Sequence, residues 1–379
     1  MNSAEGVSSD WQRAIPHKVI NALGTVTTLG GNKMFPSAVR AMSDISTSFV
    51  KLDEFSEKAG KYIANRLGVE AALITSGAAA GLTISTAALM TGTDPKLISS
   101  LPEPPKKHEI IIQCSHRNPF ERALVIAGAR LVQVGNAIET HTIEIENAIT
   151  PQTAGMIYFL QSAMYPSSLT LKETIQVCTR NSIPLIVDAA AELPPKSNLW
   201  SIANDGADLV VFSGGKEIRG PQTSGLIIGK EHLIKSSMLQ SAPNEYAIAR
   251  PMKAGKEIIA GITAAIDEYL EEDEVSRFIL WDKICDQIMT GLKKTELLVV
   301  DRVIPHHPKV QPNCIPRLRI RTKVCGDLPF LYRKLEEGTP AVFVEVRSDH
   351  IVINPQTLDI EDAELIVNKI NSIMRNRKG

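Results

Sequence analysis

Runs of consecutive apolar residues, separated by helix-like stretches, fill the first two thirds of this chain. Several runs are apolar at adjacent positions and do not alternate with polar residues, which is typical of strands buried on both faces. Such strands, alternating with helices such as residues 54–67 and 171–180, predict an α/β fold with one mostly parallel, seven-stranded sheet covered on both faces. The expected strands are residues 71–75, 109–113, 130–134, 155–160, 184–188, 208–212 and 225–229.

The pattern changes in the last third of the chain. Residues 253–294 predict one long helical stretch that leads out of the large domain. After it, short β-branched runs and a final helix at residues 359–370 predict a small C-terminal α+β domain. The expected parts are an N-terminal segment at 1–50 that contributes to the active site or an interface, a large cofactor-binding domain at 51–270, a connecting helix at 271–294 and the small domain at 295–379.

Charge and cysteine content narrow the class of partner. Lysine and arginine number 41 against 42 aspartate and glutamate residues, so the chain offers no electrostatic attraction for nucleic acid or a membrane surface. The five cysteines are scattered without a close CxxC pair, which argues against a disulfide framework or a zinc site. Neither a signal peptide nor a long apolar run is present. We expect a cytoplasmic protein that acts on a small molecule and has no metal.

Residues capable of chemistry follow several predicted strands at their carboxyl ends, where open α/β sheets form a ligand crevice. Ser76, Gly77 and Ala78 open a helix whose backbone N–H groups and dipole can bind a phosphate, although ordinary helix capping is the alternative. Asp188 ends a buried strand, where its carboxylate can hold a protonated ring nitrogen, cap a loop or bind Mg²⁺. The small Ala190 after it leaves room for a flat ring.

Two further strand ends carry a lysine and a histidine. Lys216 closes the segment Ser213-Gly214-Gly215-Lys216, where desolvation would lower its pKa and free the amine to form a Schiff base. Ser213 can donate a hydrogen bond to a cofactor phosphate. His116 can stack on the cofactor ring or contact the substrate. A solvated loop lysine and a surface loop with incidental charges are the alternatives for these two positions.

The ordered combination is more informative than any one of these signals. A phosphate loop, a ring-facing residue, a strand-end aspartate and a strand-end lysine together predict a site for pyridoxal 5'-phosphate, a cofactor that stabilises carbanions. A metal-dependent hydrolase would need clustered histidine and carboxylate ligands, and a Rossmann dehydrogenase would need a GxGxxG turn near the N-terminus. The sequence has neither pattern.

Several segments also resemble a known family. SGGKEIRGPQTSG, VDAAAE and NALGTVTTLGG are similar to the aspartate-aminotransferase superfamily of pyridoxal-phosphate enzymes, which has fold type I, and within it to the selenocysteine-synthase-related group. The similarity is greatest to the D-glucosaminate-6-phosphate ammonia-lyase branch and spans residues 21–269. The resemblance implies that Lys216 carries the cofactor and that Asp188 holds its pyridine nitrogen. It also implies a homodimer or larger homo-oligomer with active sites at the interface, which residues of ARPMKAGKE can reach, namely Arg250, Lys253 and Lys256.

Two departures from the family bear on the substrate. The chain lacks the additional N-terminal domain and the basic charge that a tRNA-handling selenocysteine synthase is expected to have, so we reject a tRNA substrate. Residues 160–164 read LQSAM where the ammonia-lyase branch is expected to carry a KSHH-like stretch. The loss of cationic and imidazole groups weakens the case for a phosphorylated sugar acid.

The resemblance implies a lyase that eliminates a β-hydroxyl and releases ammonia and a 2-oxo acid. Racemisation, aldol-type cleavage and β-replacement stay open, as does a non-catalytic relative that only binds the cofactor. We expect the fork of Arg347 to clamp the substrate carboxylate, although a surface ion pair is the alternative for this residue. The alternative candidates for binding this carboxylate are Arg319 and Arg321. We also expect Gln161 and Thr28 to contact the substrate.

Overall fold

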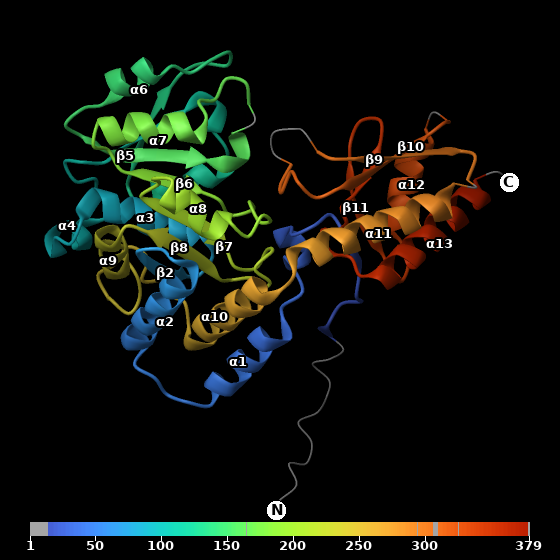
Figure 1. The fold of residues 1–379 in the computed structure, drawn as a ribbon, viewed down its shortest axis with the longest axis horizontal. Helices are drawn as coiled ribbons and strands as arrows, with labels where there is room; N and C mark the ends of the chain where they lie inside the picture. Colours follow the sequence, from blue (N-terminus) through green and yellow to red (C-terminus); the bar gives the residue numbers. More distant parts are fainter. Residues whose placement is uncertain (1–13, 164, 294, 306–309, 325, 378–379) are drawn as a thin grey trace, which may run out of the picture. The chain divides into compact units, whose positions relative to one another are not determined.

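The computed structural model describes residues 14–163, 165–293, 295–305, 310–324 and 326–377. These residues form two compact units (Figure 1). The larger unit contains residues 25–274 and 310–314, and the smaller unit contains residues 14–24, 275–305 and 315–377. The expected N-terminal segment at 1–50 and the expected connecting helix at 271–294 each contain residues of both units. The domain boundaries expected from the sequence stay predictions.

A seven-stranded sheet forms the centre of the larger unit, with the strand order β2-β8-β7-β6-β5-β3-β4. All neighbouring strands are parallel except β8, which is antiparallel to both β2 and β7. The predicted α/β class and mostly parallel sheet are therefore confirmed. The strands are β2 (Ala71–Thr75), β3 (Glu109–Gln113), β4 (Arg130–Val134), β5 (Thr153–Phe159), β6 (Leu185–Asp188), β7 (Leu209–Ser213) and β8 (Gly225–Gly229).

Helices cover both faces of this sheet (Figure 1). Adjacent residues of one strand belong to different hydrophobic clusters: Val210 and Phe212 of β7 pack on one face, and Leu209 and Val211 on the other. This division explains why the strands are apolar at consecutive positions. The first cluster includes α1 (Pro36–Ser46), α2 (Leu52–Leu67), α6 (Thr142–Ala148), α7 (Leu171–Arg180), α8 (Asn198–Asn204) and α10 (Lys256–Glu271), and the second includes α3 (Ala78–Thr91), α5 (Arg122–Ile126) and α9 (Glu231–Leu239).

The shorter helical elements of the described chain lie in connections. Their bounds are α4 (Pro95–Ser100) and the 3-10 turns η2 (Thr27–Leu29), η3 (Cys114–His116), η4 (Pro119–Glu121), η5 (Leu160–Ser162) and η6 (Pro355–Thr357).

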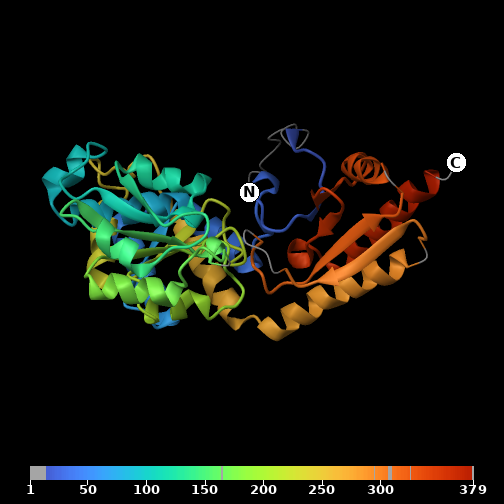
Figure 2. The same cartoon turned by 90° about the horizontal axis from the view of Figure 1, so that it is seen from above.

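The smaller unit has an α+β fold, as the sequence predicts. Its five strands are ordered β1-β11-β12-β10-β9, and α11, orange in Figures 1 and 2, packs its buried residues into the same hydrophobic cluster as these strands. Strand β1 was not expected from the sequence; it pairs in parallel with β11, more than three hundred residues further along the chain. The elements are β1 (Ile20–Ala22), β9 (Leu298–Val303), β10 (Arg317–Thr322), β11 (Val342–Val346), β12 (Ile351–Ile353), α11 (Glu274–Leu292), α12 (Asp327–Glu336) and α13 (Ile360–Asn376).

The single long helix expected over residues 253–294 is wrong, because the chain forms two helices there, α10 and α11. Glu272 follows α10 in an extended conformation with φ −60° and ψ 135°. The Lys196 ammonium donates hydrogen bonds to the carbonyl oxygens of Leu270, at 3.0 Å, and of Glu272. A cation on the last carbonyls of a helix stabilises its end. The break therefore depends on a side chain more than seventy residues away, which local periodicity does not report.

No helix in the described part of the chain is both long and apolar enough to cross a membrane. Cys114, Cys178, Cys285 and Cys314 are free thiols, and Cys325 lies outside the described residues. Within those same ranges, no group of three or more histidine, cysteine or acidic side chains is arranged to hold a metal ion.

Candidate active site

A cavity of about 550 Å³ lies in the larger unit where β6 and β7 end. Because these strands are parallel neighbours, their carboxyl ends lie at one edge of the sheet. The structure brings eight of the residues predicted from the sequence to this cavity: Ser76, Gly77, Ala78, Gln161, Asp188, Ala190, Ser213 and Lys216.

Strand alternation decides the direction of two of these side chains. Asp188 lies two residues after Ile186 in β6, and Ser213 lies two residues after Val211 in β7. Ile186 and Val211 pack in the cluster that contains α3. Since alternate residues of a strand point to the same face, Asp188 and Ser213 point to the face of the sheet that carries α3. The N-terminus of α3 also opens into the cavity, through Gly77 and Ala78.

The Lys216 amine lies in this cavity without a hydrogen-bond acceptor among the described residues. Burial lowers its pKa, and the negative charges of Asp188 and Glu192 partly oppose that shift. The loop before it is tightly packed, because a Cβ atom on Gly215 would lie 2.4 Å from the backbone Cα of Gln222. The backbone of residue 215 also accepts a hydrogen bond of 3.0 Å from the N–H of Asn32. Lys216 thus follows a loop that is tightly packed and hydrogen-bonded to neighbouring segments.

The Asp188 side chain is half-buried at the cavity, where its carboxyl interacts electrostatically with this lysine. Burial raises its pKa, whereas a hydrogen bond of 2.9 Å from the Ala190 N–H and the charge of Lys216 act in the opposite direction. The described hydrogen bonds therefore occupy only part of the accepting capacity of this carboxylate. A cationic partner in the cavity would lower the pKa of Asp188 and keep it ionised.

The N-terminus of α3 presents backbone donors rather than side chains. Gly77 has φ +100°, and a Cβ atom there would meet no other atom within 4 Å, so the space in front of it is open. The Ser76 hydroxyl instead donates a hydrogen bond of 2.7 Å to the Met252 carbonyl. An anion at this helix terminus would therefore contact mainly the N–H groups.

Several further lining residues were not predicted from the sequence, among them one acid and four residues from connecting segments. Glu192 follows Asp188 by four positions, and burial together with the Asp188 charge raises its pKa to about 7. The others come from loops that only the fold brings together: Thr27, Phe120, Gln222 and Gln311. Glu192 could have been predicted because it is an acid close behind the strand-end Asp188. The loop residues have no sequence pattern that indicates their place at the cavity.

The structure places His116 in the core and not among the residues that line the cavity. Its Nδ1 accepts a hydrogen bond of 3.1 Å from the Phe159 N–H, so Nε2 carries the proton and faces the Ser168 hydroxyl at 3.1 Å. Its ring packs edge-on against Tyr158 at 4.4 Å, and burial lowers its pKa to about 3. This differs from the expected ring-stacking role, because both nitrogens have partners in the core. The aromatic residue at the cavity is Phe120.

The remaining predicted residues of the larger unit lie outside the cavity lining. Arg250 and Lys253 are exposed, and Thr28 is exposed while its neighbour Thr27 lines the cavity. The Lys256 ammonium donates hydrogen bonds to the carbonyl oxygens of Ser46 and Ser48, at 2.8 and 2.6 Å, within its own chain.

The three arginines expected at the substrate carboxylate belong to the smaller unit. Arg347 pairs there with Glu345, while Arg319 and Arg321 both pair with Asp301. All three guanidinium groups thus have carboxylate partners in the structure.

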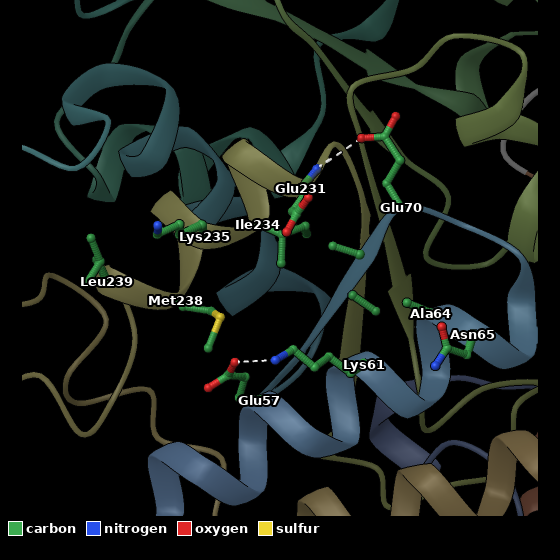
Figure 3. Close-up of a pocket in the computed structure, with 12 residues that line it drawn as sticks. Glu57, Lys61, Ala64, Asn65, Glu70, Glu231, Ile234, Lys235, Met238 and Leu239 are labelled. Atoms are coloured by element: carbon green, nitrogen blue, oxygen red, sulfur yellow. Dashed lines mark hydrogen bonds and ion pairs between the residues drawn. The ribbon is translucent and has the colours of Figure 1, made fainter.

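A second hollow of about 560 Å³ lies between α2, the edge strand β2 and α9 (Figure 3). Its charged groups are largely paired with one another or with neighbouring residues: Lys61 with Glu57 at 2.6 Å, and Glu70 with Lys230 at 2.7 Å. Neither Lys216 nor Asp188 lines it. Volume therefore does not distinguish the two hollows, but the shifted pKa values of Lys216, Asp188 and Glu192 at the first cavity do.

Comparison with known proteins agrees with the resemblance seen in the sequence. A family model described as L-seryl-tRNA selenium transferase matches residues 19–296. A 5'-C-glycyluridine monooxygenase-decarboxylase of a Streptomyces species is 34% identical over 267 residues, which cover 68% of this chain and 65% of that protein. A D-glucosaminate-6-phosphate ammonia lyase of Salmonella typhimurium is 33% identical over 258 residues, covering 66% of this chain and 68% of that protein. The aligned parts thus span about two thirds of either relative.

Solved structures show the same relationship over the whole chain. A structure of D-glucosaminate-6-phosphate ammonia-lyase superposes with a TM-score of 0.82 at 26% identity, covering 99% of this chain and 100% of that one. An alanine–glyoxylate aminotransferase of Nostoc sp. has a TM-score of 0.60 at 12% identity and supports the fold alone. The protein therefore has the type I fold of pyridoxal-phosphate enzymes and belongs to the L-seryl-tRNA selenium transferase family.

Proposed function

We propose that this protein is a pyridoxal-phosphate-dependent lyase that eliminates a β-hydroxyl from an amino acid and releases ammonia and a 2-oxo acid. The observation that carries the proposal is that Lys216 and Asp188 line one cavity, each following one of two adjacent parallel strands. The named ammonia lyase of Salmonella typhimurium, at 33% identity, supports elimination as the outcome.

The residues present fit the cofactor at three points. The Lys216 amine has no acceptor among the described residues, Asp188 has accepting capacity to spare, and the space before Gly77 is open. Lys216 would hold the carbonyl carbon of the cofactor, Asp188 its pyridine nitrogen, and the N–H groups at Gly77 and Ala78 its phosphate, with help from Ser213. When bound, pyridoxal phosphate withdraws electrons from the substrate α-carbon and so acidifies its proton.

Lys216 and Asp188 then have complementary tasks. The lowered pKa of Lys216 leaves more of its amine neutral, so the amine can accept the α-proton once the substrate has displaced it. The Asp188 carboxylate keeps a positive charge on the pyridine nitrogen by a charge-assisted hydrogen bond in a dry site. Gln161 and the small side chain of Ala190 border the space left for cofactor and substrate.

The substrate carboxylate needs a cation that the described cavity lining does not supply beyond Lys216. We propose that Arg347 provides it, because a guanidinium fork fixes the orientation of a carboxylate as well as its charge. The exposed Arg250 and Lys253 are proposed to reach the site of a neighbouring subunit in a homodimer or larger assembly. The near-neutral charge supports the lack of a nucleic-acid partner, and we also propose a cytoplasmic location.

The direct test is a product assay with purified protein, added pyridoxal phosphate and a panel of β-hydroxy amino acids. We expect ammonia and a 2-oxo acid in equal amounts from at least one of them. A substrate whose configuration changes without release of ammonia would indicate racemisation instead, and an aldehyde product would indicate aldol-type cleavage.

The first residue prediction concerns Lys216. The protein should show an absorption band at the edge of the visible range, lose it on reduction with borohydride, and yield a modified peptide that contains Lys216. Lys216→Ala should lower turnover by roughly 10³-fold or more, because it removes both the attachment point and the base. Lys61→Ala, which alters an exposed ion pair, is the control. A reduced cofactor on any other lysine would contradict the assignment.

The second prediction concerns Asp188. Asp188→Asn keeps the size of the side chain but removes the charge that holds the pyridine nitrogen protonated. We expect cofactor binding to change little, while exchange of the substrate α-proton with deuterium from the solvent slows by about 10²-fold or more. Unchanged exchange would leave Asp188 with a structural role only.

The third prediction compares two changes at the helix terminus. Gly77→Val places a side chain in the open space before α3 and strains a backbone with φ +100°, whereas Ser76→Ala removes a hydroxyl that already bonds to Met252. The dissociation constant for pyridoxal phosphate should therefore rise at least tenfold in Gly77→Val and much less in Ser76→Ala. Equal affinities in Gly77→Val and wild type would remove this loop from the phosphate site.

The fourth prediction concerns Arg347. Arg347→Lys keeps the charge but loses the planar fork, so KM for the amino acid should rise strongly while cofactor binding stays normal. Arg180→Lys, which alters an exposed pair with Glu146, is the matched control. A normal KM in Arg347→Lys would assign the clamp to another cation.

A further inference from the structure

Glu192 lines the same cavity as Lys216 and Asp188 but has no part in the assignments above. Its backbone is held on both sides: its N–H donates a hydrogen bond of 3.1 Å to the Ala189 carbonyl, and its own carbonyl accepts one of 2.6 Å from the Asn198 amide. Two prolines follow within three residues and restrict the chain further. The side chain is therefore presented to the cavity from a fixed position.

The Glu192 carboxyl makes no hydrogen bond or ion pair within the described part of the chain. Burial and the neighbouring Asp188 charge raise its pKa to about 7, and the opposing charge of Lys216 does not cancel this effect. The charged side chains among the described lining residues are therefore Lys216, Asp188 and Glu192. The Glu192 carboxyl therefore holds its proton at a higher pH than an ordinary glutamate does.

Elimination of a β-hydroxyl needs an acid, because hydroxide is a strong base and leaves slowly unless its oxygen is protonated. Lys216 cannot supply this proton at the start, since its amine must be free to take the α-proton. Asp188 is engaged with the pyridine nitrogen, and the hydroxyl and amide side chains around the cavity are too weakly acidic. Among the described lining residues, Glu192 is the acid that has no other task.

We propose that the Glu192 carboxyl is the general acid that protonates the hydroxyl leaving the substrate β-carbon. This assignment rests on the lyase function proposed above. Lys216 takes the α-proton, and the electron pair of that C–H bond forms the double bond between the α- and β-carbons. The bond between the β-carbon and oxygen breaks with its electron pair on oxygen, and the Glu192 proton completes a water molecule. Glu192 regains its proton from the Lys216 ammonium or from solvent before the next turnover.

The test uses the complete enzyme with added cofactor and compares serine with 3-chloroalanine, each as D and L forms. In Glu192→Gln, elimination from serine should fall by about 10²-fold or more, while exchange of the α-proton with deuterium stays within a few-fold of wild type. Elimination from 3-chloroalanine should remain near wild type, because chloride leaves without a proton. Glu57→Gln, a surface carboxylate paired with Lys61, should resemble wild type in all assays.

Two outcomes separate failure of this assignment from failure of the proposed function. Equal losses with serine and 3-chloroalanine in Glu192→Gln, or no loss with serine, would overturn the role of Glu192 while leaving the lyase function intact. If wild type eliminates from no β-substituted amino acid, the lyase function itself fails, and the general-acid role falls with it.

A second measurement needs no cofactor and no turnover. A carboxyl whose folded-state pKa is raised from 4.5 to about 7 stabilises the fold at low pH and loses that contribution as pH rises through this window. Glu192→Gln does not lose this stability as pH rises, because its amide side chain does not ionise. Urea unfolding of the cofactor-free protein should therefore show the variant gaining stability over wild type between pH 5 and pH 8. A stability difference that is the same at both pH values would mean that Glu192 ionises at its ordinary pKa, and the general-acid role would be wrong.

Discussion

The site depends on three half-buried ionisable groups that the fold places around one cavity at the edge of the sheet. Burial lowers the pKa of Lys216 and raises the pKa of Asp188 and Glu192, so every shift favours the neutral form. Such groups are costly to bury, and proteins keep them mainly where a ligand completes their partners. Apart from these groups, the adjacent strand residues Ile186, Val187, Val210 and Val211 are buried and apolar.

Parallel pairing gives these groups their common position. Asp188 is aligned with Val211 of the neighbouring strand, two residues before Ser213, and the Ser213-Gly214-Gly215-Lys216 loop begins there. The strands could be predicted from the sequence because burial on both faces leaves a local signal, and the cavity positions of Asp188 and Lys216 follow from where those strands end. Both residues line the same cavity in the structure.

The features that could not be predicted depend on distant contacts. The three-residue strand β1 has too little local pattern and exists because β11 offers it an edge. The break between α10 and α11 is capped by Lys196, and Phe120 reaches the cavity from a turn that carries no periodic signal. His116 was expected at the cavity because it follows a strand end. Its ring nitrogens instead bond to the Phe159 N–H and the Ser168 hydroxyl, contacts that the local sequence does not indicate.

The contact between the segment after β1 and the lysine loop has a consequence for the colour of bound cofactor. Gly31 approaches the Gly215 carbonyl so closely that a Cβ atom would lie 2.5 Å from it, and the N–H of Asn32 donates to the same carbonyl. The close packing of the lysine loop therefore includes a segment almost two hundred residues earlier in the chain. On the proposed assignment of Lys216, the yellow colour of bound cofactor would report that this distant segment is in place as well as the loop itself.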